Sequence, residues 1–233
     1  MDKLRDLRKE LKKLGDIEKS KVLQKYFKTG KGEYGAGDIF LGITVPETRK
    51  IALKYKDLEL RQVQELLKSK IHEERFCALE ILVFKYSKGD ERAKSLVFNF
   101  FIKNTKYINN WDLVDTSAPY IVGEFLLGKN KDILYKLAKS DNLWERRIAI
   151  VSTYAFIKNG KFGDTIKLSE ILLKDKHDLM QKAVGWMLRE MGKKDEKELL
   201  KFLNMHCKEM PRTMLRYSIE RLDESKRKFY MGK

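Results

Sequence analysis

The feature that most constrains the fold of this sequence is a segment type that recurs at a nearly constant interval. Five segments begin with polar or charged residues and continue into an apolar helical stretch, and their anchors are residues 74, 110, 145, 181 and 212. The intervals between these anchors are 36, 35, 36 and 31 residues. A regular step of this size is typical of paired helices that stack one pair upon the next.

The apolar spacing inside these segments predicts helices throughout. Met180, Val184, Met187 and Leu188 would share one helical face, and no segment shows the sustained alternation of a β-strand. The interval is slightly short for HEAT or armadillo repeats, and the tetratricopeptide pattern is absent. We therefore expect an all-α fold, an α-α superhelix or solenoid of HEAT-like repeats. Each inner helix begins at an anchor and lines a concave wall, and the outer helices are expected at residues 91–104, 131–139, 164–173 and 196–205.

We expect a single domain over residues 1–233. Its stacked helical pairs would occupy residues 47–222 and a C-terminal tail residues 223–233, whereas residues 1–46 would hold an N-terminal helical region, drawn as one helix over 2–27, and a glycine-rich connection. No buried strand precedes the glycines, and their spacing does not match a phosphate-binding loop. The connection is therefore predicted to be structural, with Phe40, Leu41 and Ile43 packed on the helices.

The charge balance favours a polyanionic partner. The chain has 50 Lys and Arg against 34 Asp and Glu, a formal net charge of +16. Heat-adapted proteins are also rich in lysine, but their glutamates balance the positive charge of the lysines, and here the acidic residues do not. Nucleic acid is the partner most expected for such a surface, with a merely solvated lysine-rich surface as the alternative.

Other classes of protein are disfavoured by what the sequence lacks. No apolar run approaches the ~20 residues of a membrane span, and the first residues lack the apolar core of a secretory signal. Cys77 and Cys207 are far apart and fit small buried thiols of a reducing compartment. We expect a cytoplasmic protein with no membrane association.

Metal and nucleophile chemistry find little support in the sequence. His72, His177 and His206 are scattered, and none belongs to a zinc motif or to a Ser/His/Asp arrangement. Each is interpreted as an ordinary core or surface histidine. We expect no metal and no cofactor.

Two tryptophans, a carboxylate and an arginine remain as candidates for chemistry. Trp111 and Asp115 are four residues apart and would share a helical face, and Pro119 predicts an interruption shortly after Asp115. Trp186 points away from the apolar stripe of its own helix, so it either lines a groove or packs on a neighbouring helix. A helical wheel places Arg146, rather than Arg147, toward solvent.

These residue types suit a cationic substrate. Aromatic faces attract cations, a carboxylate stabilises positive charge that develops on a sugar, and arginine binds phosphate. An alkylated purine in DNA is a cationic base, and cleavage of its glycosidic bond builds positive charge on the deoxyribose. The residue set is complementary to that transition state.

Several segments, in order and at matching spacing, resemble one known family. The sequence is similar to the HEAT-like-repeat DNA alkylation repair proteins, the AlkD-like alkylpurine DNA glycosylases, and the similarity covers nearly the whole chain. It rests on GEYGAGDIFLGITVPETRK (32–50), NNWDLVD (109–115), DNLWERRIAI (141–150), LMQKAVGWMLRE (179–190) and MPRTMLRYSIERL (210–222).

The resemblance implies a specific reaction. Family members remove cationic N3- and N7-alkylated purines, such as 3-methyladenine and 7-methylguanine, from duplex DNA without metal or cofactor and without flipping the base into a pocket. It implies that Trp111 and Trp186 contact the lesion nucleotide, that Asp115 acts on the anomeric carbon and water, and that Arg147 holds the phosphate backbone. The motif thus selects Arg147 where the wheel selects Arg146. Asn110 stands where the family members known best have an aromatic residue, which bears on substrate range and rate.

We therefore expect a monomeric, monofunctional glycosylase whose partner is double-stranded DNA that contains alkylated purines. A non-catalytic HEAT-like module for damaged or branched nucleic acid, and a protein-interaction scaffold, are the alternatives. The expected DNA contacts are Arg146, Arg147, Lys158, Lys161, Lys182, Arg189, Arg212 and Arg216.

Overall fold

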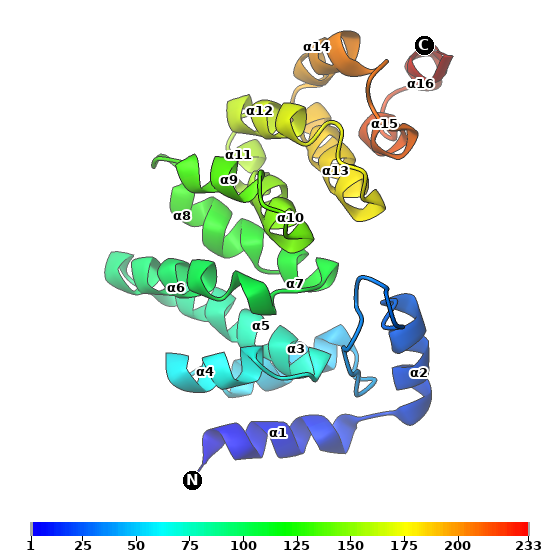
Figure 1. The fold of residues 1–233 in the computed structure, drawn as a ribbon. Helices are drawn as coiled ribbons and strands as arrows, with labels where there is room; N and C mark the ends of the chain where they lie inside the picture. Colours follow the sequence, from blue (N-terminus) through cyan, green and yellow to red (C-terminus); the bar gives the residue numbers. More distant parts are fainter. Residues whose placement is uncertain (1, 233) are drawn as a thin grey trace. The chain divides into compact units, whose positions relative to one another are not determined.

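The computed structural model of this protein describes residues 2–232, and these residues form an all-α fold (Figure 1). One isolated backbone bridge, between Ile39 and Ile71, is the β-type pairing found among residues 2–232. The chain divides into two compact units, Met1–Ser117 and Ala118–Lys233. The expected single domain remains a prediction.

Unit 1 carries the first seven α-helices. They are α1 (Lys3–Leu14), α2 (Ile17–Tyr26), α3 (Val45–Lys54), α4 (Leu60–Leu67), α5 (His72–Lys88), α6 (Glu91–Lys103) and α7 (Trp111–Asp115), with a 3-10 turn at Thr105–Tyr107.

Unit 2 begins with a π-helical turn, Pro119–Gly123. Its helices are α8 (Glu124–Leu126), α9 (Asp132–Leu137), α10 (Leu143–Ser152), α11 (Tyr154–Lys158), α12 (Gly163–Ile171), α13 (Asp178–Lys194), α14 (Glu196–His206), α15 (Arg212–Ile219) and α16 (Glu224–Gly232).

The predicted repeat positions are confirmed. The helices α5, α7, α10, α13 and α15 begin within three residues of the five anchors, and the outer helices correspond to α6, α9, α12 and α14. Residues 223–233, drawn from the sequence as a tail, contain helix α16. The buried Tyr230 anchors that helix, because its hydroxyl donates to Asn204 Oδ1 at 2.9 Å.

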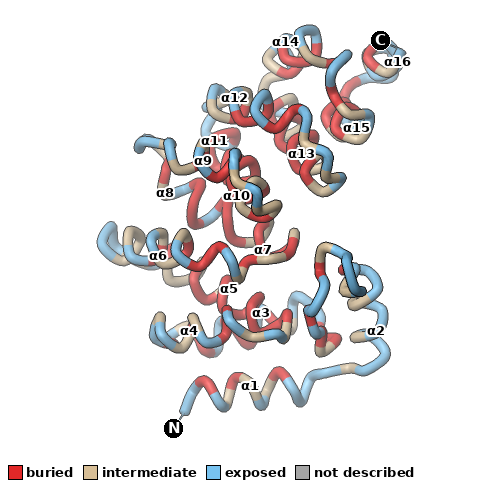
Figure 2. Tube along the Cα trace, viewed as in Figure 1, coloured by how far each residue is buried: buried red, intermediate tan, exposed pale blue. Residues whose placement is uncertain are grey.

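The expected single helix over residues 2–27 is wrong, because the chain breaks at Gly15 and forms two helices. Helix α1 buries Leu4, Leu7 and Leu11 and packs on α3 and α5. Asp16 then caps a new helix by accepting hydrogen bonds from the N–H groups of residues 18 and 19. All ten residues of α2 are described, and none of them is buried (Figure 2).

Helix α5 forms the centre of unit 1 and packs against α3, α4, α6 and α7. Its first turn is buried even though it is polar: His72, Glu73, Glu74 and Arg75 are each 3% exposed. Polar groups so deep in a protein need hydrogen-bond partners. Their partners come from the N-terminal helices, from the connection that follows α2, and from α7.

Glu73 ties the glycine-rich connection to α5. Its carboxylate accepts hydrogen bonds from the backbone N–H groups of Leu41 (2.9 and 3.0 Å), Gly42 (2.9 Å) and Ile43 (3.3 Å). Phe40 and Ile43 are buried, as predicted, and Leu41 is half-buried. The connection is therefore a fixed part of unit 1.

Gly42 lies where two backbone segments meet. It has φ +86°, and a side-chain carbon there would overlap the carbonyl oxygen of Asp16. The adjacent Leu41 carbonyl accepts a hydrogen bond from the Asp16 N–H at 2.8 Å. Glycine at this position thus lets the connection approach the start of α2 closely.

Helix α13 forms the centre of unit 2 and packs against α10, α14 and α15. Gly185 permits the approach of α15, because a side-chain carbon on Gly185 would lie 2.6 Å from the Met214 carbonyl oxygen. Trp186, the next residue of α13, lies beside this close contact between α13 and α15.

The two cysteines are buried free thiols, as the sequence predicts. Burial raises the pKa of the Cys77 thiol, which disfavours its thiolate. Among residues 2–232, no helix is both long and apolar enough to cross a membrane.

Candidate functional site

Helix α7 carries two of the predicted site residues. Asn110 caps it, since its Oδ1 accepts a hydrogen bond from the Trp111 N–H at 2.8 Å. Trp111 and Asp115 lie one turn apart, and both are half-buried. Helix α7 ends at Asp115 and helical structure resumes at Pro119, so the predicted interruption is confirmed.

Aromatic side chains surround Trp111. Its indole stacks on the Phe27 ring, with the centroids 5.2 Å apart and the planes at 10°. The exposed Tyr26 ring meets it edge-on at 6.1 Å and 74°. The Tyr34 hydroxyl is hydrogen-bonded to the indole, and burial raises the pKa of Tyr34. These contacts fix the plane of the Trp111 ring.

The ring stack continues from Trp111 to a histidine. Phe27 stacks on Phe40 with the centroids 4.8 Å apart, and Phe40 stacks on the His72 imidazole at 4.3 Å and 21°. Phe27 also contacts the imidazole at 5.2 Å. His72 thus lies at the buried end of a stack whose other end is Trp111.

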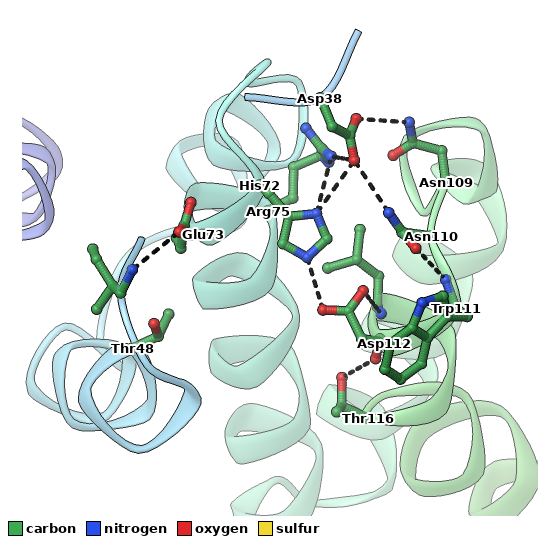
Figure 3. Close-up of polar contacts among 12 residues, drawn as sticks. Asp38, Thr48, His72, Glu73, Arg75, Asn109, Asn110, Trp111, Asp112 and Thr116 are labelled. Atoms are coloured by element: carbon green, nitrogen blue, oxygen red, sulfur yellow. Dashed lines mark hydrogen bonds and ion pairs between the residues drawn. The ribbon is translucent and has the colours of Figure 1, made fainter. Parts of the chain in front are cut away.

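His72 binds two carboxylates (Figure 3). Its Nε2 lies 2.7 Å from Asp112 Oδ2, and its Nδ1 lies 3.3 Å from Asp38 Oδ2. Arg75 Nη2 contacts the same Asp38 oxygen at 2.6 Å. All four side chains are buried, so they form one charge network that joins the connection, α5 and α7.

The network favours the charged form of the imidazole. Burial by itself lowers the pKa of His72, but the charge of Asp112 and the hydrogen bonds to both carboxylates outweigh it, so the pKa is raised above 6.5. Burial likewise works against the ionised form of Asp38, yet the bond from His72 and the charge of Arg75 lower the pKa of that carboxyl. The two carboxylates thus favour the imidazolium form of His72.

The network also reaches the cap of α7. The side-chain amides of Asn109 and Asn110 each donate to Asp38 at 3.4 Å. Asn110 therefore contacts Asp38 through its amide nitrogen and caps α7 through its oxygen. The polar side chain of Asn110 thus serves both contacts.

A cavity of about 260 Å³ adjoins the network within unit 1. His72, Glu73 and Asp112 are among its polar lining residues. The rest of the lining is mainly apolar and includes Val22, Leu23, Phe27, Phe40, Ile43 and Phe76.

This network was not predicted from the sequence. His72 was interpreted as an ordinary histidine because it belongs to no zinc motif and no Ser/His/Asp arrangement. Asp38 and Asp112 belong to the quoted motifs, but residues 38, 72 and 112 are too far apart for their spacing to indicate contact. The available signal was the polar start, HEER, of an inner helix that is otherwise apolar.

In unit 2, Trp186 is half-buried on α13. Its ring lies 6.1 Å from the Tyr154 ring at 33°, and its indole nitrogen donates to Glu190 Oε1 at 3.2 Å. Trp186 thus packs partly on a neighbouring helix while a part of it stays accessible. Trp144, on α10, is buried.

The two arginines of α10 have different surroundings. Arg147 is 5% exposed, and its Nη1 donates to the Leu179 carbonyl at 2.6 Å. Arg146 is half-buried, pairs with Asp175 at 2.7 Å and donates to the carbonyls of residues 140 and 141. Arg146 is the more accessible of the two, as the helical wheel predicts.

The remaining predicted DNA contacts differ in exposure and pairing. Lys182 pairs with Asp178 at 2.7 Å, and Arg189 pairs with Glu220. The exposed ones are Lys158, Lys161, Arg212 and Arg216. The exposed cations are the better candidates for phosphate contacts. Binding a phosphate carries a smaller desolvation penalty for them and breaks fewer existing ion pairs.

Comparisons with known proteins place this chain in a family. The model of the DNA alkylation repair enzyme family matches residues 7–222. The chain belongs to this family. Among solved structures, it is similar to one described as a predicted DNA alkylation repair enzyme from Enterococcus faecalis, with 16% identity, a TM-score of 0.73 and coverage of 90% of this chain and 97% of that one. No curated protein matches the sequence.

The fold and the general role are therefore established. This DNA alkylation repair enzyme has an all-α helical-repeat fold and acts in the repair of alkylated DNA. Within residues 2–232, no group of three or more His, Cys, Asp or Glu side chains is arranged to hold a metal ion. The roles of the individual site residues remain predictions.

Proposed function

We propose that this enzyme is a monofunctional DNA glycosylase that hydrolyses the N-glycosidic bond of cationic N3- and N7-alkylated purines in duplex DNA. The product would be an abasic site. The observation that carries the proposal is the pairing of Trp111 with Asp115 on α7, two half-buried side chains one turn apart that are held by a buried network. An accessible indole beside a carboxylate is suited to a cationic nucleoside.

The proposed reaction follows from the charge of the substrate. The bond between C1′ of the deoxyribose and the purine nitrogen breaks, and the electron pair leaves with the base, which departs neutral. The Asp115 carboxylate stabilises the positive charge that builds on the sugar. A water then bonds to C1′ and gives its proton to Asp115 or to solvent, while Trp111 offers its π-face to the cation.

Trp186 and several cations of unit 2 are also proposed to contact DNA. Trp186 would contact the lesion nucleotide, and Arg147 or the more accessible Arg146 would hold the backbone. Exposed Lys158, Lys161, Arg212 and Arg216 would add phosphate contacts, with Lys182 and Arg189 exchanging their present partners for phosphates. We further propose that the protein acts as a monomer in the cytoplasm, without metal or cofactor.

Incubation with a duplex that contains 7-methylguanine tests the proposal. We expect free 7-methylguanine in solution and an intact strand that breaks only on alkaline treatment, because an abasic site is alkali-labile. An unmodified duplex is the control and should release no base. Tight duplex binding with no base release, at excess enzyme and long incubation, would contradict the proposal and favour the non-catalytic binding module.

Replacing Arg212 by Ala should weaken duplex binding whatever the DNA sequence. Arg212 is exposed at the start of α15, and its Nη2 donates only to a backbone carbonyl, that of Met231, among the hydrogen bonds described. The loss of one phosphate contact should reduce the slope of log affinity against log salt by about one. Fluorescence anisotropy of a labelled duplex over a salt series measures this slope.

Arg92→Ala is the matched control, since Arg92 is also exposed but lies on α6, a predicted outer helix. Its slope should equal that of the wild type. Equal slopes for Arg212→Ala and the wild type would remove Arg212 from the set of phosphate contacts.

A further inference from the structure

We propose that His72, bound by Asp38 and Asp112, is a positioning residue that sets the orientation of α7 and therefore of Trp111 and Asp115. The contacts that carry this inference lie within unit 1. Its consequence for catalysis rests on the proposed function, whereas its consequence for the geometry of α7 does not.

The first connection between His72 and the site runs through the backbone. His72 Nε2 contacts Asp112 Oδ2 at 2.7 Å, and Asp112 directly follows Trp111 in the chain. The other oxygen of Asp112 accepts a hydrogen bond from the Leu113 N–H at 2.9 Å. His72 is thus bound to a residue in the first turn of α7 whose own side chain also contacts the α7 backbone.

The second connection runs through aromatic rings. The imidazole stacks on Phe40, Phe40 stacks on Phe27, and Phe27 stacks on the Trp111 indole, at centroid distances of 4.3, 4.8 and 5.2 Å. A positively charged imidazole is attracted to the face of a phenyl ring. The backbone route and the ring route therefore meet at Trp111 from two sides.

Helix α7 needs such support. It has five residues, and a helix of that length is unstable in isolation, because nucleation consumes most of its hydrogen-bond energy. Its N-cap, Asn110, is itself bonded to Asp38, the second carboxylate of His72. The same network thus holds the cap and the first turn of α7.

The protonation of His72 decides how much of the network survives. The imidazolium donates to both carboxylates, whereas the neutral ring has one N–H for the two. The charged groups that face it are Asp38 from the connection, Asp112 from α7, and Arg75 and Glu73 from α5, with Lys19 of α2 lining the adjacent cavity. Arg75 Nη2 lies 3.4 Å from Nδ1 and can donate to the neutral ring, so the contact to Asp38 is the one lost first.

The direction of the pH effect follows. The pKa of His72 is raised in the folded protein, so the support is fully present below pH 6.5 and is lost as the pH rises through the raised pKa. Trp111 should therefore change its environment as the pH rises above 6.5.

Indole NMR of the ¹⁵N-tryptophan-labelled full chain tests the geometry directly. The chain has three tryptophans, and Trp111→Phe identifies the Trp111 signal. In His72→Gln we expect that signal to shift or broaden while those of Trp144 and Trp186 stay unchanged. In the wild type it should titrate with a midpoint above 6.5, and Asp38→Asn should move the midpoint to lower pH.

Single-turnover base release from the 7-methylguanine duplex tests the catalytic consequence. His72→Gln should lower the rate constant about 10–100-fold, the effect of a small misplacement of catalytic groups, with duplex affinity within about twofold of the wild type. His206→Gln is the control, because His206 lies at the end of α14 and should affect neither readout. Phe40→Leu is the second variant, for use if His72→Gln does not fold. It keeps both carboxylate contacts of His72 but removes the ring stack, and it should shift the Trp111 signal.

The outcomes are distinct. An unchanged Trp111 signal in folded His72→Gln, or in Phe40→Leu, overturns the inference whatever the enzyme does. A shifted signal with an unchanged base-release rate refutes the catalytic consequence. If the wild type releases no base, the proposed function fails, and the Trp111 signal still decides whether His72 positions α7.

Discussion

Asp115→Asn is expected to lower the rate of 7-methylguanine release about 10²–10³-fold, the usual cost of removing one group that stabilises transition-state charge. Asparagine keeps the size and the polarity of the side chain but lacks the negative charge that the developing sugar cation requires. Duplex affinity should stay the same or rise slightly, because a negative charge that faces a polyanion is removed. Single-turnover kinetics with excess enzyme separate the chemical step from binding.

Asp57→Asn serves as the control for this substitution. Asp57 is an exposed carboxylate of unit 1 that follows α3, and its replacement removes the same charge from the same protein. Its base-release rate should match the wild type. A rate for Asp115→Asn within a factor of two of that control would show that the reaction does not depend on the carboxylate.

Gly42→Ala is expected to destabilise unit 1 by about 2–5 kcal/mol. Alanine costs about 1–2 kcal/mol in a left-handed conformation, and the overlap with the Asp16 carbonyl adds about 1–3 kcal/mol because backbone must move. Movement there also stretches the hydrogen bond between the Gly42 N–H and Glu73. Urea unfolding followed by Trp111 fluorescence, with Trp144 and Trp186 replaced by Phe, reports on this unit.

Gly37→Ala is the matched control for the backbone conformation. Gly37 has φ +89°, almost the value at Gly42, but a side-chain carbon there would meet no atom within 4 Å. Gly37→Ala should therefore destabilise unit 1 only by the cost of alanine in a left-handed conformation, about 1–2 kcal/mol. Equal losses for the two substitutions would mean that the close approach to Asp16 contributes nothing.

The helical framework could be predicted from the sequence because it depends on local periodicity. The apolar stripes on α10 and α13 recur every three or four residues, and the polar helix starts mark each repeat, so the helix positions needed no knowledge of distant contacts. The break at Gly15 was missed because the charged pattern continues across it. Asp16 caps the start of α2 there, a local signal that a long amphipathic pattern hides.

The candidate site could be predicted only in part. Trp111 and Asp115 are four residues apart, so helical geometry alone places them on one face. The contacts of His72 could not be found this way, because they join a loop, a long helix and a short helix through residues 34 and 40 positions away. Tyr26 and Phe27 were likewise missed as neighbours of Trp111, since nothing in the sequence indicates that the end of α2 lies against it.

The burial of both cysteines makes the protein well suited to site-specific tethering. A thiol reacts through its thiolate, so Cys77 should remain inert toward disulfide reagents, and Cys207 is shielded by the helices around it. A single cysteine introduced at an exposed position such as Lys158 would then be the fastest-reacting thiol. DNA carrying a disulfide linker could be trapped there without first removing the natural cysteines from the protein.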